Sequence, residues 1–408
     1  MTAIPDATVW VGLDVGKAEH FADVLADDGD RLFAVSVPND ETALERVLDR
    51  AATHGPVAVA IDQPGSIAQL VLAVCARRTV PVAYIPGLVM RRAADLYPGE
   101  SKTDRRDAYV IADTARTRRR QVTWIDASSD ELLDELRVLN GYDADLAVDV
   151  TRTASHLRDT LTAVSPALER VLGERVAHPA VRALLAAYPT PTALRAAGPD
   201  RIEAVLVEHA PRLGRRLAGE IAAALDAQTV TLRAEAPNGR VVAELAVDLG
   251  RLHQRRDSLA EEIEQVFLAH PFGRLLVTIP GIGPRTGAVI LAEIGDGTAF
   301  ANGSKLAAYA GLAPVARQSG TSLNSESRSR RGNHRLKNAM FMAAFCSRRS
   351  PDSRAYYDRK RAEGKRHNAA VMCLARRRCD VILAILTTQT PYTLQTPPHS
   401  SEDLKEVA

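Results

Sequence analysis

Alternating apolar and polar positions near the start of the chain predict three β-strands with short turn signals between them. Apolar residues spaced three and four apart then predict helices that alternate with short, continuously apolar strands. This order is typical of an α/β domain with a mixed sheet. The predicted elements are strands at 8–14, 20–25 and 32–37, a helix at 41–52, a strand at 57–61, a helix at 66–77, a strand at 82–85 and a helix that begins near Thr103.

The pattern becomes helical from about 128 to 268, where Leu, Ala, Arg and Glu dominate. Ser128 and Ser129 fit the capped start of the first long helix. Three prolines between 189 and 199 divide the stretch into several helices. Residues 245–268 predict one long amphipathic helix, whose apolar stripe suits either coiled-coil pairing or packing in a bundle. An oligomerisation or spacer role is therefore favoured for this region.

These patterns divide the chain into four regions. Residues 1–125 form the α/β domain, and 126–269 form a helical spacer or coiled-coil region. Residues 270–390 form a helical C-terminal domain. The last segment, 391–408, is rich in Pro, Ser and Glu and is predicted to be a disordered tail. The predicted fold class is thus α/β plus all-α.

Composition adds little that is unusual. Hydrophobic residues make up 46% and charged residues 25% of the 408 positions, as in ordinary globular proteins. The four cysteines form no CxxC pattern, which argues against zinc and disulfide frameworks and favours a reducing, cytoplasmic setting. We expect no signal peptide and no membrane span, because the apolar runs are too short.

The net charge of +2 conceals a strong asymmetry. Between Arg317 and Arg378 there are 17 Lys and Arg residues against four acidic residues. A segregated basic block is typical of a surface that binds a polyanion such as DNA, whereas a merely solvated face usually mixes both signs. The candidate nucleic-acid contacts are Gly281, Gly283, Arg317, Arg328, Arg330, Arg331, Arg335 and Lys337.

Four aspartates form a candidate metal site. Asp14 and Asp62 each end a predicted strand, while Asp104 and Asp107 share one face at the start of a helix. Each alone is more simply interpreted as a cap or turn residue. Together, converging carboxylates need a cation, and oxygen ligands favour Mg²⁺ or Mn²⁺, which can activate a nucleophile at a phosphodiester.

A glycine turn opens the C-terminal domain. Residues 275–279 and 285–294 are helical in pattern, and Pro280-Gly281-Ile282-Gly283-Pro284 lies between them. Glycines let a phosphate approach backbone N–H groups at the start of the second helix. This helix–hairpin–helix pattern favours DNA contact independent of sequence, and a simple helical hairpin is the alternative.

A candidate nucleophile, Ser319, precedes Gly320 in a flexible, serine-rich loop that opens the basic block. Its hydroxyl could attack a phosphodiester if it were activated, and nearby arginines could hold the scissile phosphate. On spacing alone, a serine here is more often an ordinary loop residue.

Taken together, these motifs resemble a known family. Gly-Leu-Asp-Val-Gly-Lys at 12–17, Lys-Thr-Asp-Arg-Arg-Asp-Ala at 102–108, Ile-Pro-Gly-Ile-Gly-Pro at 279–284, Gly-Leu-Ala-Pro at 311–314 and Gln-Ser-Gly at 318–320 resemble the DEDD transposases of the insertion-sequence "one-ten" family, as does Arg-Arg-Gly-Asn at 330–333. That family also includes Piv-like DNA invertases, and the resemblance covers nearly the whole chain.

The resemblance implies a ribonuclease-H-like (RuvC-like) N-terminal domain with Asp14, Asp62, Asp104 and Asp107 as metal ligands. It implies Ser319 as a nucleophile that forms a phosphoserine with DNA. It further implies dimers or tetramers with sites completed between protomers, action at the nucleoid, and in some members guidance by a noncoding bridge RNA. Asp62 departs from the family's usual Glu, and Ser322 and Ser325 are the neighbouring candidate nucleophiles.

Other functions remain open from the residues alone. A RuvC-like Holliday-junction resolvase would use the acidic site with water and would not need Ser319. A non-enzymatic nucleic-acid-binding protein would leave the acidic site unexplained. An actin-like or sugar-kinase ATPase lacks a later nucleotide motif. A tyrosine recombinase using Tyr356 or Tyr357 lacks the accompanying Arg-His set.

Overall fold

The computed structural model describes residues 5–63, 65–97, 103–125, 130–319, 323–329 and 331–393. It divides into two compact units. One consists of Met1–Glu131 with Asp296–Leu306, and the other of Leu132–Gly295 with Ala307–Ala408. The predicted capped start at Ser128 and Ser129 and most of the predicted tail, from residue 394 on, lie outside the described residues.

The first unit is built on a mixed six-stranded sheet with the strand order β3-β2-β1-β4-β5-β6. The neighbours of β4 run parallel to it, whereas the other adjacent pairs are antiparallel. The sheet confirms the α/β prediction. Its elements are β1 (Val9–Asp14), β2 (Glu19–Ala26), β3 (Arg31–Pro38), α1 (Glu41–Ala52), β4 (Val57–Ile61), η1 (Ser66–Ala68), α2 (Gln69–Arg77), β5 (Val82–Tyr84), α3 (Gly87–Ala94), α4 (Asp104–Thr117) and β6 (Thr123–Ile125).

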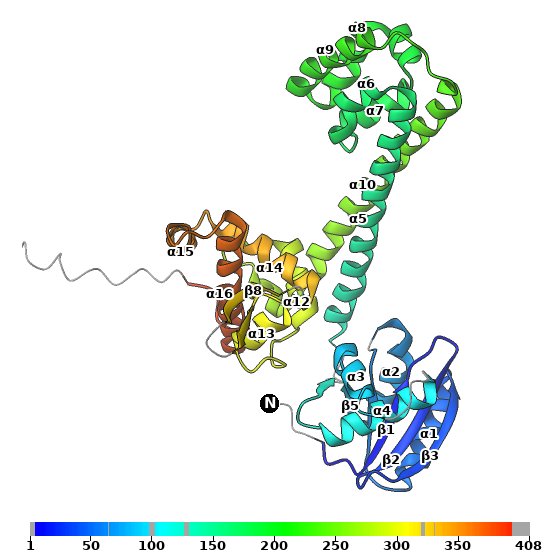
Figure 1. Cartoon of the computed structure of the whole chain (residues 1–408), viewed down its shortest axis with the longest axis vertical. Coiled ribbons are helices and arrows are strands. Elements are labelled where there is room, and N and C mark those ends of the chain that lie inside the picture. The colour runs from blue at the N-terminus through cyan, green and yellow to red at the C-terminus, as the bar shows by residue number, and fades with distance from the viewer. Residues whose placement is uncertain are drawn as a thin grey trace, which may run out of the picture. The chain divides into compact units, whose positions relative to one another are not determined.

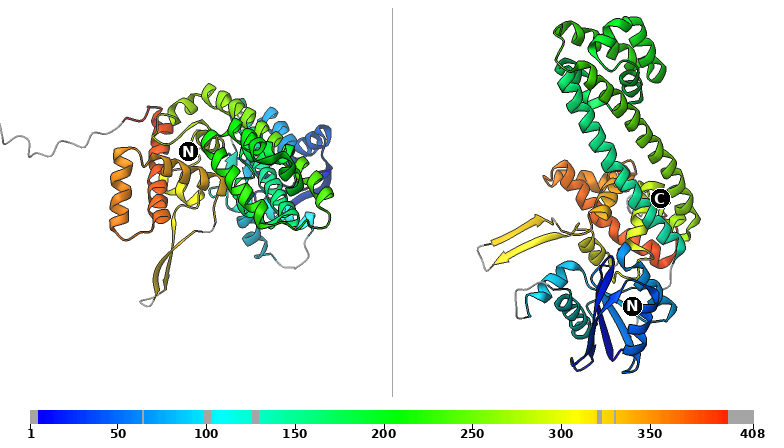
Figure 2. Two further views of the ribbon diagram at one scale, coloured as in Figure 1. Left: turned by 90° about the horizontal axis from the view of Figure 1, so that it is seen from above. Right: turned by 90° about the vertical axis from the view of Figure 1, so that its right-hand side faces the viewer.

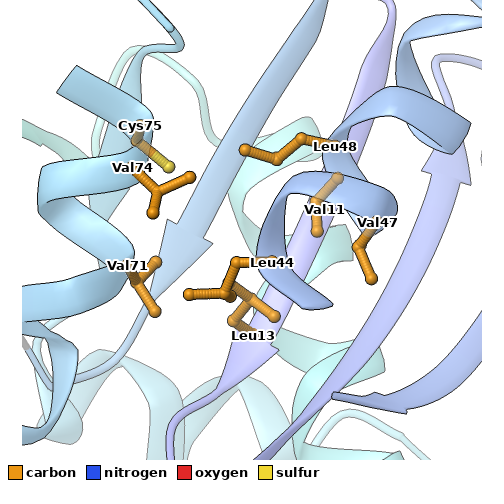
Figure 3. A pocket seen from close by; sticks show the side chains of 8 residues that line it. All are labelled: Val11, Leu13, Leu44, Val47, Leu48, Val71, Val74 and Cys75. Atoms are coloured by element: carbon orange, nitrogen blue, oxygen red, sulfur yellow. The ribbon is translucent and has the colours of Figure 1, made fainter. Parts of the chain in front are cut away.

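Helices cover both faces of this sheet (Figures 1 and 2). Strand residues alternate between the faces, so Val11 and Leu13 pack in the core with α1 and α2, while Trp10 packs with α4. Figure 3 shows the α1–α2 side, where apolar side chains enclose a cavity of about 10 Å³, close to the minimum for one water. This face of the sheet is therefore part of the packed core. The cavity is lined by Val11, Leu13, Leu44, Val47, Leu48, Val71, Val74 and Cys75.

The second unit contains two long helices, α5 (Glu131–Val164) and α10 (Glu235–Ala269), which lie side by side (Figures 1 and 2). They lead into a helical lobe with its own core, which includes Leu157 of α5 and Val242 of α10. Inside α8, Gly198 has a φ of 76° just before Pro199, and the helix kinks there. The lobe consists of α6 (Pro166–Leu172), η2 (Gly173–Arg175), α7 (Pro179–Ala187), α8 (Pro191–His209) and α9 (Pro211–Ala227).

The C-terminal part of the chain is mostly helical, as predicted, but it also contains a β-hairpin. Strands β7 (Pro314–Ser319) and β8 (Leu323–Arg328) pair in the segment that we predicted to be a flexible loop. The hairpin extends outward from the helices of its unit (Figure 2). The helices here are α11 (Pro271–Leu276), α12 (Pro284–Ile294), α13 (Gly303–Tyr309), α14 (His334–Ser347), α15 (Pro351–Ala362) and α16 (His367–Thr388).

Candidate functional site

Asp14 and Asp62 come together at one edge of the sheet. Asp14 is the last residue of β1, and Asp62 follows β4, which pairs in parallel with β1 so that Leu13 lies opposite Ile61. Side chains alternate along a strand, and Trp10 and Ala60 belong to the core under α4. Asp14 and Asp62 are even-numbered like these residues, so both lie on the face that α4 covers.

Helix α4 runs antiparallel to β1, and Gly12 sets the close approach between them. A Cβ atom at Gly12 would lie 2.2 Å from the carbonyl oxygen of Ala108, so only glycine fits there. At the other end of the helix, Arg116 Nη1 donates a hydrogen bond to the carbonyl of Asp27, 2.8 Å away, next to the start of β1. The start of α4 therefore lies toward the edge where β1 ends in Asp14.

Asp104 and Asp107 occupy the first turn of α4. Thr103 caps the helix by accepting a hydrogen bond from the backbone N–H of Arg106. Asp107 is half-buried and Asp104 is exposed. The positive end of the helix dipole favours carboxylates at this place, with or without a metal.

All four aspartates thus belong to elements that meet at one edge, but their side chains are not gathered into a finished cage. Among the described residues, no group of three or more His, Cys, Asp or Glu is arranged to hold a metal ion. The donor set nevertheless suits Mg²⁺, which binds oxygen, commonly uses one or two protein carboxylates and keeps several waters.

A fifth acidic residue, Asp23, lies on the same face and was missed by the sequence analysis. It pairs in register with Gly12 in β2 and is fully buried. Arg31 holds its carboxylate with Nε 3.0 Å from Oδ1 and Nη2 2.9 Å from Oδ2. Burial raises the pKa of Asp23, and the Arg31 guanidinium opposes that shift. The sequence signal that could have found Asp23 is an acidic residue among the apolar positions of the strand predicted at 20–25.

Ser319 is the last paired residue of β7, opposite Leu323. It therefore lies at the outer end of the hairpin, next to the connection at 320–322, which includes Ser322 and lies outside the described residues. Ser325 is in the middle of β8, opposite Arg317. Strand pairing consequently places the backbone of Ser319, but not that of Ser325, beside the hairpin turn.

A hydrogen-bonded group fixes the base of this hairpin. The backbone N–H of Asn333 donates to the carbonyl of Tyr309 at 2.8 Å, and its side-chain Nδ2 donates to the Tyr309 hydroxyl at 3.1 Å and to Glu293. A Cβ atom at Gly311 would lie 2.0 Å from the carbonyl oxygen of Arg331. The two segments that lead into the hairpin are therefore held against each other. We call Tyr309, Asn333 and Glu293 the hairpin clamp.

The predicted glycine turn lies between α11 and α12. Gly281 has a φ of 88°, and a Cβ there would lie 2.4 Å from the carbonyl oxygen of Ala343 in α14. Gly281 is thus required by packing as well as by conformation. Gly283 is exposed, with open space where a Cβ would be, directly before the start of α12.

The other predicted nucleic-acid contacts differ in exposure. Arg331 and Arg335 are exposed, whereas Lys337 is half-buried and donates from Nζ to the carbonyl of Ser329 at 2.9 Å. Arg317 and Arg328 lie on the two hairpin strands, and Arg330 lies outside the described residues. No helix in the described part of the chain is long and apolar enough to cross a membrane.

Comparison with known proteins gives two family matches. Residues 11–166 match a DEDD model described as a transposase, and residues 273–358 match a model described as the transposase IS116/IS110/IS902 family. The first match covers the strands and helix that carry the four aspartates, and the second covers the glycine turn and the β7–β8 hairpin.

Whole-length relatives agree with these matches. The chain is 46% identical to an uncharacterized 43.6 kDa protein of insertion element IS110 from Streptomyces coelicolor, over 96% of this chain and 97% of that protein. It is 29% identical to the mini-circle putative transposase for IS117 from the same organism, over 97% and 96%. It is also 35% identical to the pilin gene-inverting protein of Moraxella bovis, over 29% of this chain and 38% of that one. The chain therefore belongs to the IS110/IS116 family of insertion-element transposases, and it is a DNA transposase or recombinase.

Proposed function

We propose that this transposase cuts and rejoins DNA strands with Ser319 as its nucleophile and with a divalent metal bound by Asp14, Asp62, Asp104 and Asp107. The observation that carries the proposal is the meeting of the ends of β1 and β4 with the start of α4 at one edge of the sheet. Carboxylates that approach one another at such an edge repel unless a cation lies between them.

The four aspartates would hold Mg²⁺ or Mn²⁺ through carboxylate oxygens. When bound, such an ion lowers the cost of deprotonating an attacking hydroxyl and stabilises the oxygen that leaves phosphorus. Asp62 is a residue shorter by one methylene than the Glu usual in the family, but it follows β4 directly, so its carboxylate stays close to the sheet edge.

Ser319 would act by transesterification. Its Oγ forms a bond to the scissile phosphorus, and the bond from phosphorus to one deoxyribose oxygen breaks, so that oxygen leaves as a hydroxyl. A hydroxyl of the second strand then attacks the phosphoserine and restores the serine. The phosphodiester energy is conserved, which removes the need for ATP. Arginines on and beside the hairpin, such as Arg317 and Arg331, would neutralise the phosphate.

We also propose a domain division, the substrates and the partners of this transposase. We assign 1–125 to a ribonuclease-H-like domain, 126–269 to a helical spacer, 270–390 to the DNA-joining domain with a helix–hairpin–helix, and 391–408 to a tail. The substrates are the ends of the element and its target DNA, bound at the nucleoid. A homo-oligomer would bring an acidic centre to each serine, and a bridge RNA would select the sites.

The serine is tested by trapping a covalent adduct. Wild-type protein, Ser319→Ala and the matched control Ser325→Ala are incubated with cleavable DNA and Mg²⁺, denatured and examined for protein-linked DNA. We expect adducts in wild type and Ser325→Ala and none in Ser319→Ala. An adduct that persists in Ser319→Ala moves the nucleophile elsewhere, with Ser322 the next candidate. No adduct in active wild type favours a resolvase-like reaction with water.

The metal centre is tested with Asp14→Asn and with the double change Asp104→Asn and Asp107→Asn. Each is expected to abolish strand cleavage in Mg²⁺ while thermal unfolding stays near wild type. Asp28→Asn is the matched control, because Asp28 is exposed in the turn between β2 and β3. Full activity of either site variant would refute the metal assignment.

A further inference from the structure

Helix α16 contains an unusual arginine. Arg378 of α16 is only 6% exposed. Its Nη2 lies 3.4 Å from the hydroxyl of Ser353 in α15. Its Nε and Nη1 are buried, and neither has a hydrogen-bond partner among the described residues. The two helices that carry these residues, α15 and α16, lie next to each other (Figure 1).

Arg378 remains charged although it is buried. Burial lowers the pKa of its guanidinium to about 10, which still leaves it protonated at neutral pH. In the described part of the chain, no carboxylate forms an ion pair with it. Buried charges are normally paired, because an uncompensated buried charge is strongly destabilising. An anion beside the guanidinium would compensate this charge.

The start of α15 provides further donors beside Arg378. Ser350 precedes the helix with extended backbone angles but makes no side-chain capping hydrogen bond, and its hydroxyl is buried with no partner among the described residues. Pro351 occupies the first helical position, so the next backbone N–H groups belong to Asp352 and Ser353. N–H groups in a first turn have no partner within the helix, and together with the helix dipole they attract anions.

The surroundings favour an external anion over an internal one. Asp380 is the acid nearest to Arg378 in sequence, but it pairs with Arg376 at 3.0 Å. Asp352, in the first turn of α15, is exposed. The neighbouring residues Arg349 and Arg354 are cationic and exposed. The donors here are the Arg378 guanidinium, the Ser350 and Ser353 hydroxyls and the N–H groups in the first turn of α15. So many donors match the several acceptor oxygens of a phosphate better than the two oxygens of a carboxylate.

We propose that Ser350, Ser353, Arg378 and the first turn of α15 bind one phosphate of a nucleic-acid backbone. The inference rests on the proposed function, because that function brings DNA and a bridge RNA to this domain. It adds a contact site that lies outside the hairpin and the glycine turn. Since the guanidinium is shielded, binding requires that the Ser350 and Arg378 side chains turn toward the phosphate.

The first test uses inorganic phosphate and the full-length protein. Thermal unfolding is measured with and without phosphate, at constant ionic strength, for wild type, Arg378→Met and the control Arg376→Met, which removes the same charge two residues away. We expect phosphate to raise the unfolding temperature of wild type and Arg376→Met but not that of Arg378→Met. Without phosphate, Arg378→Met should unfold no earlier than wild type. Earlier unfolding together with a preserved phosphate effect would make Arg378 a structural residue and overturn the proposal.

The second test measures binding to duplex DNA and to single-stranded RNA as salt is increased. Arg378→Met should weaken at least one of these complexes by about tenfold and reduce the slope of log K against log salt by about 1. The nucleic acid affected identifies the source of the phosphate. Ser353→Ala, a smaller change, should reduce affinity in the same complex and serves if Arg378→Met fails to fold.

Three outcomes refute the assignment in different ways. A lost phosphate effect with unchanged binding of both nucleic acids means that the site takes another anion. A phosphate effect that appears only after Glu402→Gln, Asp403→Asn and Glu406→Gln means that the chain's own acids occupy the site. Absence of a phosphate effect in every form, this triple variant included, excludes the site. Failure of the Ser319 adduct test leaves these measurements intact, so the two proposals fail separately.

Discussion

Replacing Gly12 by alanine should push α4, which carries Asp104 and Asp107, away from β1, which ends in Asp14. The new Cβ would lie 2.2 Å from the carbonyl oxygen of Ala108 and 2.5 Å from the backbone nitrogen of Ala112. Ordinary contact begins at 3.4 Å, so α4 must move about 1.2 Å from β1. Overpacking of this kind costs about 1–3 kcal/mol. A displacement of about 1 Å at a catalytic centre can cost about a hundredfold in rate.

The assay compares urea unfolding and Mg²⁺-dependent DNA cleavage in Gly12→Ala and Gly87→Ala. Gly87 begins α3 in the same unit, is exposed and has no atom within 4 Å of its would-be Cβ. We expect Gly12→Ala to lose about 1–3 kcal/mol of unfolding free energy and about a hundredfold in cleavage rate. Gly87→Ala should change neither. If Gly12→Ala cleaved DNA at the wild-type rate, the contact between α4 and β1 would not position the centre.

Three further predictions concern the second unit and the metal. Burial raises the pKa of Asp143, but Arg256 and Arg285 outweigh that and hold it below the usual 3.8. Asp143→Asn should therefore lower unfolding free energy by about 1–3 kcal/mol at neutral pH, and the difference should vanish in urea titrations as pH falls below 3.8. In the hairpin clamp, Tyr309→Phe should slow formation of the covalent adduct while thermal unfolding stays nearly unchanged; equal adduct rates would exclude a positioning role. Chelation by EDTA should stop strand cleavage, Mg²⁺ should restore it, and cleavage that continues in EDTA would contradict the metal centre.

Much of the first unit could be predicted because local pattern decides it. The strand at 57–61 and the helix at 41–52 have the predicted bounds, since their apolar spacing matches one period throughout. Strand β6 was missed because three residues are too short to show alternation. The β7–β8 hairpin was also missed, because its strands are polar and its serines resemble loop residues. Its order comes from cross-strand pairing and from the hairpin clamp, both of which are tertiary.

In the candidate site, too, some residues could be placed from the sequence and others could not. Asp14 and Asp62 could be placed at a sheet edge from sequence, because they follow strands whose pairing could be guessed. The position of Asp23 could not be predicted, because it depends on which strand pairs with β1. The hydrogen bond between Asn333 and Glu293 could not be predicted either, because it joins residues 40 positions apart. Arg378 was counted only as one charge in a basic block. Its burial depends on how α15 and α16 pack, and sequence periodicity does not reveal that.

The helical lobe between α5 and α10 is an insertion with a hydrophobic core of its own. Its entry and exit helices lie side by side, and its core is filled from α6 to α9 and the adjoining ends of the two long helices. The first family match ends at residue 166 and the second begins at residue 273, whereas the whole-length relatives also cover the lobe. Such a segment can be lengthened, shortened or exchanged by joining new sequence to the same two helices. We therefore expect changes of sequence or length within the lobe to leave the chain path of the β7–β8 hairpin unaltered.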